Sequence, residues 1–173
     1  MIDDDDQLSA LLPRIQSADW IALDTEADSL HAYPEKLCLL QISLPGDDVI
    51  IDPLGRMSLT PLFDVLKDRE LILHGADYDL RMLWKGCRFR PRSMFDTMWA
   101  ARLLGYSEFG LTQLAGQVLG ITLEKGSQKT NWARRPLTER MEQYARNDTR
   151  YLRPLAEALS RELEKLDRAA WQA

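Results

Sequence analysis

Residues 20–26 carry the sequence WIALDTE, a run of apolar residues that ends in two acids. A short and nearly continuous apolar run is typical of a buried strand. Because successive side chains of a strand alternate between its two faces, Asp24 and Glu26 are expected to point the same way. Two like charges beside an apolar core repel each other and lose hydration, so the pair is disfavoured unless a cation is present. The alternative is a strand end that holds both acids in solvent.

The segments around this strand alternate between strand-like and helix-like patterns, which predicts an α/β domain. Further strands are expected at residues 37–43, 49–51 and 71–73, the first two completing an antiparallel meander with residues 20–24. Helices are expected at residues 7–16, 59–67, 77–84, 95–104 and 111–118, the first capped by Asp5 or Asp6. A longer helical pattern follows the capping residue Thr138, and Pro154 marks a kink or a break in it.

The composition is that of an ordinary globular chain: 173 residues, 45% apolar and 28% charged. It contains no run of the ~20 apolar residues that cross a membrane. Its first residues lack the basic and apolar segments of a signal peptide. The two cysteines form neither a metal-spaced pair nor a disulfide framework, so the expected compartment is the cytoplasm. The net charge of −5 argues against a nucleic-acid partner unless the surface carries a local basic track.

Two more acids lie where structural and functional explanations compete. Asp148 falls on the apolar stripe of the last helical pattern, one turn after Tyr144. A carboxylate in such a stripe needs a partner. If Asp148 has only a structural role, that partner is an arginine or a set of backbone N–H groups. Asp79 lies in the first turn of the helix expected at residues 77–84, where the helix dipole favours an acid and Asp77 fits the capping position.

Taken together, the acids at these three sites favour a metal centre. Asp24, Glu26, Asp79 and Asp148 are hard oxygen donors without cysteine or histidine in matching positions, which suits Mg²⁺ or Mn²⁺ better than zinc. Two such ions ~3.5–4 Å apart can clamp the attacking and leaving oxygens of a phosphodiester. Tyr144 is near enough to Asp148 to orient or deprotonate the attacking water. These five residues form the predicted catalytic set.

The ordered motifs Asp24-x-Glu26, Asp79 and Tyr144-x-x-x-Asp148 resemble those of the DEDD exonuclease superfamily in its tyrosine branch. Ribonuclease D and the exosome-associated exoribonucleases are the members that the chain resembles most, over roughly residues 15–160. Flanking sequences contribute to the resemblance: LQI at 40–42, IDPLG at 51–55 and TNWARRPLTE at 130–139. In the histidine branch, His occupies the position that is Gln143 in this chain.

This resemblance implies an RNase H-like fold, in which a mixed β-sheet is flanked by α-helices. It implies a 3′-5′ exoribonuclease that releases nucleoside 5′-monophosphates from single-stranded RNA 3′ ends. It also implies that the four acids hold two divalent ions, Mg²⁺ or Mn²⁺, and that Tyr144 positions the water. The chain departs from the family at Ala27-Asp28, where members often carry a large apolar residue that wedges against the terminal base, and Leu30 is the candidate substitute.

Seven residues near the motifs are expected to contact substrate: Thr25, Leu30, Gln41, His74, Lys129, Trp132 and Arg134. The basic stretches 81–92 and 125–135 are either phosphate tracks or ordinary solvated faces. Trp132 either stacks on a base or anchors its loop in the core.

Residues 1–173 are expected to form a single domain without the C-terminal helical RNA-binding domains of ribonuclease D. Its partner is expected to be RNA, with DNA and very short oligonucleotides as alternatives on the same site, because sugar choice depends on contacts to the 2′-OH. A non-catalytic nucleic-acid-binding module and a phosphodiesterase for a small nucleotide are further alternatives. The sequence predicts no oligomeric state.

Overall fold

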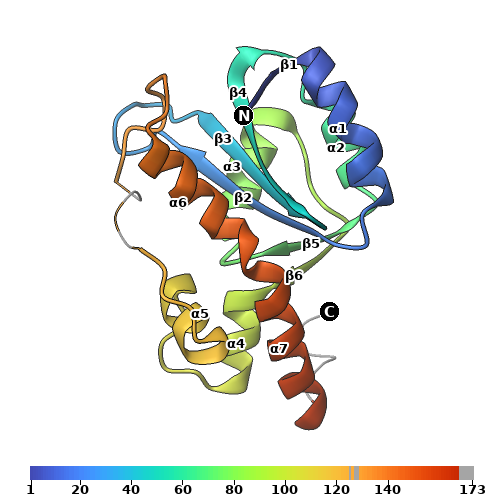
Figure 1. The fold of residues 1–173 in the computed structure, drawn as a ribbon, viewed down its shortest axis with the longest axis vertical. Helices are drawn as coiled ribbons and strands as arrows, with labels where there is room; N and C mark the ends of the chain where they lie inside the picture. Colours follow the sequence, from blue (N-terminus) through green and yellow to red (C-terminus); the bar gives the residue numbers. More distant parts are fainter. Residues whose placement is uncertain (125, 127–128, 168–173) are drawn as a thin grey trace.

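The computed structural model describes residues 1–124, 126 and 129–167. Within these residues one sheet contains six strands in the order β1-β4-β3-β2-β5-β6 (Figure 1). The strands are β1 Ile2–Asp4, β2 Ile21–Ala27, β3 Leu37–Leu44, β4 Asp47–Arg56, β5 Glu70–Leu73 and β6 Ser93–Asp96. Strands β2, β3 and β4 form the predicted antiparallel meander, whereas β1, β5 and β6 run parallel to their neighbours. The sheet is therefore mixed, as predicted.

Helices cover both faces of the sheet, as Figure 1 shows. They are α1 Asp5–Ser17, α2 Thr60–Leu66, α3 Asp77–Cys87, α4 Thr97–Leu104, α5 Leu111–Leu119, α6 Glu139–Arg150 and α7 Leu152–Lys165. Apolar residues of α1, α2 and α3 share one core with alternate residues of β2 and β3. Helix α6 and the start of α7 pack on the opposite face, and α4, α5 and the rest of α7 form a separate cluster. In the described part of the chain, none of these helices has the length and apolar character of a membrane span.

Strand β2 divides its side chains between the two cores. Leu23 packs with α1, α2 and α3, whereas its neighbour Ala22 packs with α7. Asp24 and Glu26 continue the alternation from Ala22, so both carboxylates lie on the face that α6 crosses. The predicted common direction of the two acids is confirmed, because their carboxylates belong to one close group.

The long helical pattern is broken into α6 and α7 at Tyr151, three residues before Pro154. Thr138 caps α6 as predicted, because its side chain accepts a hydrogen bond from the Met141 N–H. Pro154 lies in the first turn of α7, where a missing N–H leaves no helical hydrogen bond unmade. The break lets α6 cross the sheet while α7 packs against α4 and α5.

The structure corrects several local predictions. The edge strands β1 and β6 have only three and four residues and carry too little pattern to be predicted. Since β1 precedes α1 directly, Asp4 caps that helix, and Asp5 instead accepts the N–H of Ser58. The cap of α3 is Ala76, so Asp77 does not have the predicted capping role; its exposed carboxylate pairs with Arg81.

Arg135 fixes the loop before α6 to the sheet. Its guanidinium binds the carboxylate of Asp52 on β4 with two hydrogen bonds and donates to the carbonyls of Cys38 and Trp132. Asp52 is only 5% exposed. A buried carboxylate that loses its cation keeps the full cost of its lost hydration.

Arg135→Met is therefore expected to lower the free energy of unfolding by about 3 kcal/mol, because Asp52 would stay buried without its cation. Urea denaturation measures the change. The exposed neighbour Arg134 supplies a matched control, and Arg134→Met is expected to change stability by about 0.5 kcal/mol or less. Equal losses in the two variants would contradict a clamping role for Arg135.

Candidate active site

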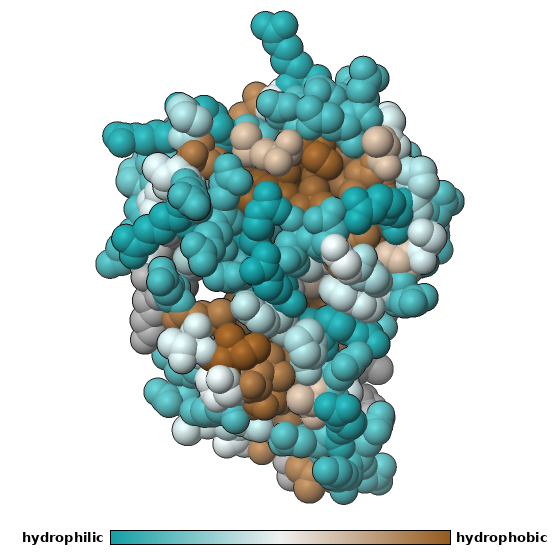
Figure 2. Space-filling view, in the orientation of Figure 1, coloured by the Kyte–Doolittle hydropathy of each residue, from teal (hydrophilic) through white to brown (hydrophobic). Residues whose placement is uncertain are grey.

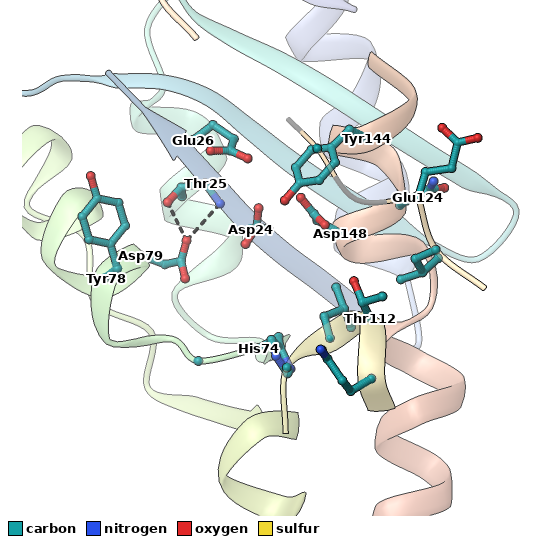
Figure 3. Close-up of a pocket in the computed structure, with 17 residues that line it drawn as sticks. Asp24, Thr25, Glu26, His74, Tyr78, Asp79, Thr112, Glu124, Tyr144 and Asp148 are labelled. Carbon is teal, nitrogen blue, oxygen red and sulfur yellow. Dashed lines mark hydrogen bonds between the residues drawn. The ribbon is translucent and has the colours of Figure 1, made fainter. Parts of the chain in front are cut away.

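A cavity of about 530 Å³ opens where β2, α3, α5 and α6 meet (Figure 3). All five predicted catalytic residues line it: Asp24, Glu26, Asp79, Tyr144 and Asp148. In Figure 2 the face that α6 crosses is largely hydrophilic, with apolar residues gathered over α5 and over the upper part of the sheet. The cavity thus joins residues from strands and helices that are distant in the sequence.

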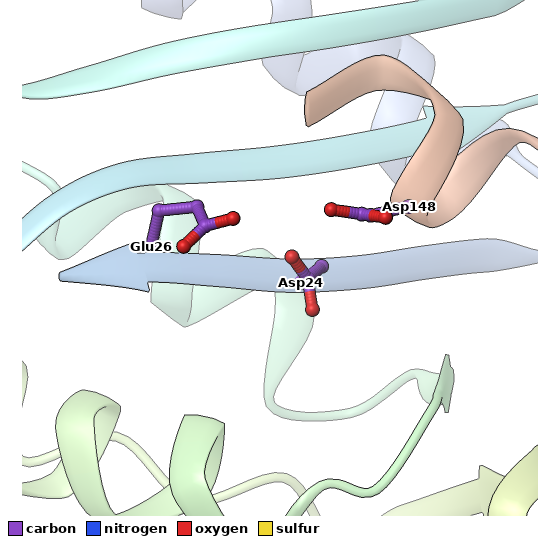
Figure 4. Close-up of side chains that lie close together, drawn as sticks. All are labelled: Asp24, Glu26 and Asp148. Carbon is purple, nitrogen blue, oxygen red and sulfur yellow. The ribbon is translucent and has the colours of Figure 1, made fainter. Parts of the chain in front are cut away.

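Three carboxylates form the centre of this cavity. Asp24, Glu26 and Asp148 each offer an oxygen, and these oxygens lie within 4.8 Å of one another (Figure 4). Two come from one face of β2, and the third comes from the helix that crosses this face. Their oxygen donors and spacing fit a hard divalent cation such as Mg²⁺ or Mn²⁺.

Asp79 approaches the group from α3 and is held against β2. Its Oδ1 accepts hydrogen bonds from the Thr25 N–H at 3.0 Å and from the Thr25 hydroxyl at 2.5 Å, shown dashed in Figure 3. The side chain is 5% exposed. Thr25 thus fixes Asp79 next to Asp24, although Asp79 lies outside the group of three.

Burial and mutual repulsion raise the pKa values of these acids. Burial, followed by repulsion from Asp79, Asp148 and Glu26, raises the pKa of Asp24 well above its usual value. The same two causes raise the pKa of Glu26 to about 9. For Asp148 burial outweighs a hydrogen bond from Tyr144 and raises the pKa to about 7, and burial raises that of Asp79 to about 6. A bound cation would offset the repulsion, so the electrostatics also fit a metal centre.

The metal-free protein is expected to lose stability as the pH rises from about 5 to about 9. In the unfolded chain the pKa values of these acids are about 4. Folded Asp79, Asp148 and Glu26 keep their protons up to pKa values of about 6, 7 and 9. Between these limits the folded state binds more protons than the unfolded state, so the free energy of unfolding falls with rising pH.

Thermal melts in EDTA at several pH values measure this decline, with Glu26→Gln as the comparison. The variant has one titrating acid fewer, so its melting temperature should fall less between the same pH values. Saturating Mg²⁺ should restore stability most at high pH, where the ionised acids bind it. A melting temperature in EDTA that increases toward pH 9 would contradict the described repulsion.

Tyr144 and Asp148 face the cavity one turn apart on α6, and the tyrosine hydroxyl hydrogen-bonds the carboxylate. The ring of Tyr144 lies 6.0 Å, centre to centre, from that of Trp132. Trp132 is 1% exposed and belongs to the core beneath α6. Trp132 therefore packs against the Tyr144 ring from the side of the core.

The predicted substrate contacts separate into three groups. Thr25 and His74 line the cavity, and the His74 ring bonds the Thr97 hydroxyl at 2.9 Å. Leu30, Lys129 and Arg134 are exposed but do not belong to the described lining. Gln41 and Trp132 are buried in the core, which contradicts direct substrate contact through either side chain. For Trp132, the core alternative is the one that the structure supports.

Sequence reasoning missed part of the cavity wall: Tyr78, Gly110, Leu111, Thr112, Gln113 and Glu124. Tyr78 could have been found from the sequence, because it directly precedes Asp79. The beginning of α5 reaches the site only through the packing of α4, α5 and α7, which no local pattern predicts. Residues 125, 127 and 128 of the predicted basic loop lie outside the described residues.

A mixed sheet with helices on both faces, and with carboxylates on its central strand opposite a helix, defines an RNase H-like domain with a candidate metal centre. A family model described as 3′-5′ exonuclease matches residues 1–164, and the chain belongs to this family. The resemblance derived from the three acidic motifs is thereby confirmed.

Named relatives agree with this assignment. Ribonuclease D of Zymomonas mobilis is 38% identical over 176 residues, which cover 99% of this chain and 45% of the relative. The structure of Escherichia coli RNase D, described as an exoribonuclease involved in structured RNA processing, matches with 34% identity and a TM-score of 0.88. That match covers 95% of this chain and 45% of the other. The chain thus spans a little under half the length of these relatives.

A third relative, NrnC of Brucella melitensis bound to pGG, matches with 29% identity and a TM-score of 0.81. The match covers 91% of this chain and 79% of that one. The same protein has also been solved with bound Mg²⁺.

Proposed function

We propose that the protein is a metal-dependent 3′-5′ exoribonuclease that releases nucleoside 5′-monophosphates from single-stranded RNA. The observation that carries the proposal is the group of three carboxylates whose oxygens lie within 4.8 Å of one another in an open cavity. Buried acids with raised pKa values are costly in a module that only binds nucleic acid, and a metal-assisted reaction gives them a role. The RNase D relatives support RNA as the substrate.

We infer that two divalent ions, Mg²⁺ or Mn²⁺, bind here and are held by Asp24, Glu26, Asp79 and Asp148. When bound, such ions supply Lewis acidity and charge at the attacking and leaving oxygens of the phosphodiester. The close oxygens of three of these acids and the position of Asp79 beside them support this set. The relative with bound Mg²⁺ supports the choice of a hard cation.

The chain's own residues have separate tasks in this proposal. Tyr144 orients the attacking water through its hydroxyl, which bonds Asp148. Thr25 keeps Asp79 in place through two hydrogen bonds. The wall formed by Tyr78 and the beginning of α5 limits the space in which the terminal nucleotide lies.

A second candidate function is the hydrolysis of very short oligonucleotides on the same site. The match to NrnC bound to pGG favours it, since this chain covers 79% of that protein. A cavity of about 530 Å³ is in the size range of small-ligand pockets and can hold a terminal nucleotide. DNA is the alternative polymer, because the choice between the two polymers depends on contacts to the 2′-OH.

A chain-length series on RNA and DNA separates these candidates. Dinucleotides and longer single strands of both polymers are incubated with the protein and Mn²⁺, and the rates of nucleotide release are compared. Faster release from long RNA supports the exoribonuclease. A clear preference for dinucleotides would support the second candidate. Faster release from DNA would make DNA the substrate of the same exonuclease reaction.

The cytoplasm is the compartment that fits this proposal, where RNA 3′ ends are available. Cys38 and Cys87 are free thiols, the usual state in that compartment.

A further inference from the structure

The side-chain amide of Gln41 is buried and has no hydrogen-bond partner among the residues that the structure describes. Gln41 is 0% exposed, and neither its Oε1 nor its Nε2 makes a hydrogen bond within the described residues. A primary amide can donate two hydrogen bonds and accept two, and its burial without any is unfavourable. An unpaired group of this kind requires an explanation in a native core.

The register of the sheet places this amide beside the acids. In the antiparallel pairing of β2 with β3, Gln41 lies directly opposite Asp24, and on its other side Gln41 faces Ile50 of β4. Residues directly opposite each other point to the same face, with their Cβ atoms about 5 Å apart. Gln41 therefore shares the face that carries the metal-binding carboxylates.

Its neighbours along β3 show that this face is covered by α6. The Ser43 hydroxyl bonds that of Thr149 on α6 at 2.7 Å, and Leu39 belongs to the core that contains Ala145. Gln41 lies between Leu39 and Ser43 on β3, on the face that α6 covers. It is not part of the cavity lining, so substrate cannot touch it.

Few polar groups can pair with this amide. Ile50, Leu39 and Ala145 offer no side-chain polar atoms, and the Ser43 hydroxyl already bonds both Asp48 and Thr149. Of the two residues that the register pairs with Gln41, Ile50 has no polar side chain, so the carboxylate of Asp24 is the acceptor that lies directly across from the amide. Carboxylates that bind metal ions are commonly held by hydrogen bonds from a second layer of residues.

We propose that Gln41 is a positioning residue of the metal centre and that its Nε2 donates a hydrogen bond to the carboxylate of Asp24 when the ions are bound. This inference rests on the metal centre of the proposed function. The donated bond orients one carboxylate oxygen, so that the other points at the ion. Gln41 contributes no atom to the ion or to the RNA.

The test compares two substitutions at Gln41 with one at Ile50, its partner on the neighbouring strand β4. Gln41→Met keeps the length of the side chain and removes both polar atoms. Ile50→Val removes one methylene from the residue that faces Gln41 on the side away from Asp24. Gln41→Leu is a second, smaller variant, which keeps the test valid if methionine fits poorly.

Calorimetric titration of Mn²⁺ into the metal-free proteins gives the metal affinity, and urea denaturation in EDTA gives the stability. Gln41→Met and Gln41→Leu are expected to keep the stability and to lower Mn²⁺ affinity by about tenfold or more. Their rate should recover as the Mn²⁺ concentration is raised, with the KM for RNA unchanged. Ile50→Val should lose stability and keep its Mn²⁺ affinity within about twofold.

Two results would overturn the inference in distinguishable ways. If both Gln41 variants bind Mn²⁺ as tightly as the parent, Gln41 has no positioning role, while the proposed function is untouched. If the parent protein itself neither binds Mn²⁺ nor hydrolyses RNA, the proposed function and this inference fall together.

Discussion

Asp24→Asn is expected to slow the hydrolysis of single-stranded RNA by at least about a thousandfold while the protein stays folded. Repulsion from the other three acids of the site contributes to the raised pKa of Asp24, so its carboxylate is close to all of them. Its substitution removes one charge and one ligand oxygen from the metal centre. Metal ions contribute several kcal/mol to such reactions, and each 1.36 kcal/mol corresponds to about tenfold in rate.

The fold should survive because the amide of asparagine relieves repulsion. Thermal melts in EDTA are expected to give a melting temperature at least as high as that of the parent. Asp77→Asn is the matched control, since Asp77 lies in the same turn as Asp79 but is exposed and pairs with Arg81. Its rate is expected to stay close to that of the parent, because the Asp77 side chain does not belong to the described cavity lining. Full activity of Asp24→Asn would exclude the proposed metal centre.

Tyr144→Phe is expected to slow hydrolysis by about a hundredfold or more and to leave Mn²⁺ affinity nearly unchanged. A positioned group that orients water or moves its proton contributes about 10²–10⁴-fold. Tyr144 is not among the proposed metal ligands, and a phenylalanine ring retains the packing against Trp132. The loss should therefore be seen in kcat rather than in metal binding.

Rates at saturating RNA and calorimetric titration with Mn²⁺ measure the two quantities separately. Tyr106→Phe controls for the loss of a tyrosine hydroxyl elsewhere, since that hydroxyl bonds Glu162 of α7 outside the cavity. It should hydrolyse RNA at the rate of the parent. If Tyr144→Phe is as fast as Tyr106→Phe, the water is positioned by another group.

The parts of the fold that were predictable have strong local patterns. Strand β2 is almost continuously apolar before Asp24, and α6 shows its stripe and its cap at Thr138. The edge strands β1 and β6 are too short for a pattern to develop. The position of the break before α7 depends on packing against α4 and α5, which sequence spacing does not contain.

In the candidate site, too, local patterns were predictable and features that depend on tertiary packing were not. Asp24, Glu26 and Asp148 of the proposed catalytic set could be predicted because paired acids on a strand and an acid in an apolar stripe are costly without a partner. The roles of Trp132 and Gln41 could not be predicted from the sequence. An aromatic or amide side chain near a motif is equally compatible with a core position and with contact to the substrate. Only the burial of both residues decides between these alternatives. The cavity wall from α5 required the tertiary structure.

A time course with 5′-labelled single-stranded RNA in Mg²⁺, Mn²⁺ or EDTA tests the proposed metal-dependent exonuclease most directly. We expect a ladder that shortens from the 3′ end one nucleotide at a time with either metal, and unchanged RNA in EDTA. Internal cuts, shortening that persists in EDTA, or intact RNA with metal and folded protein present would contradict it.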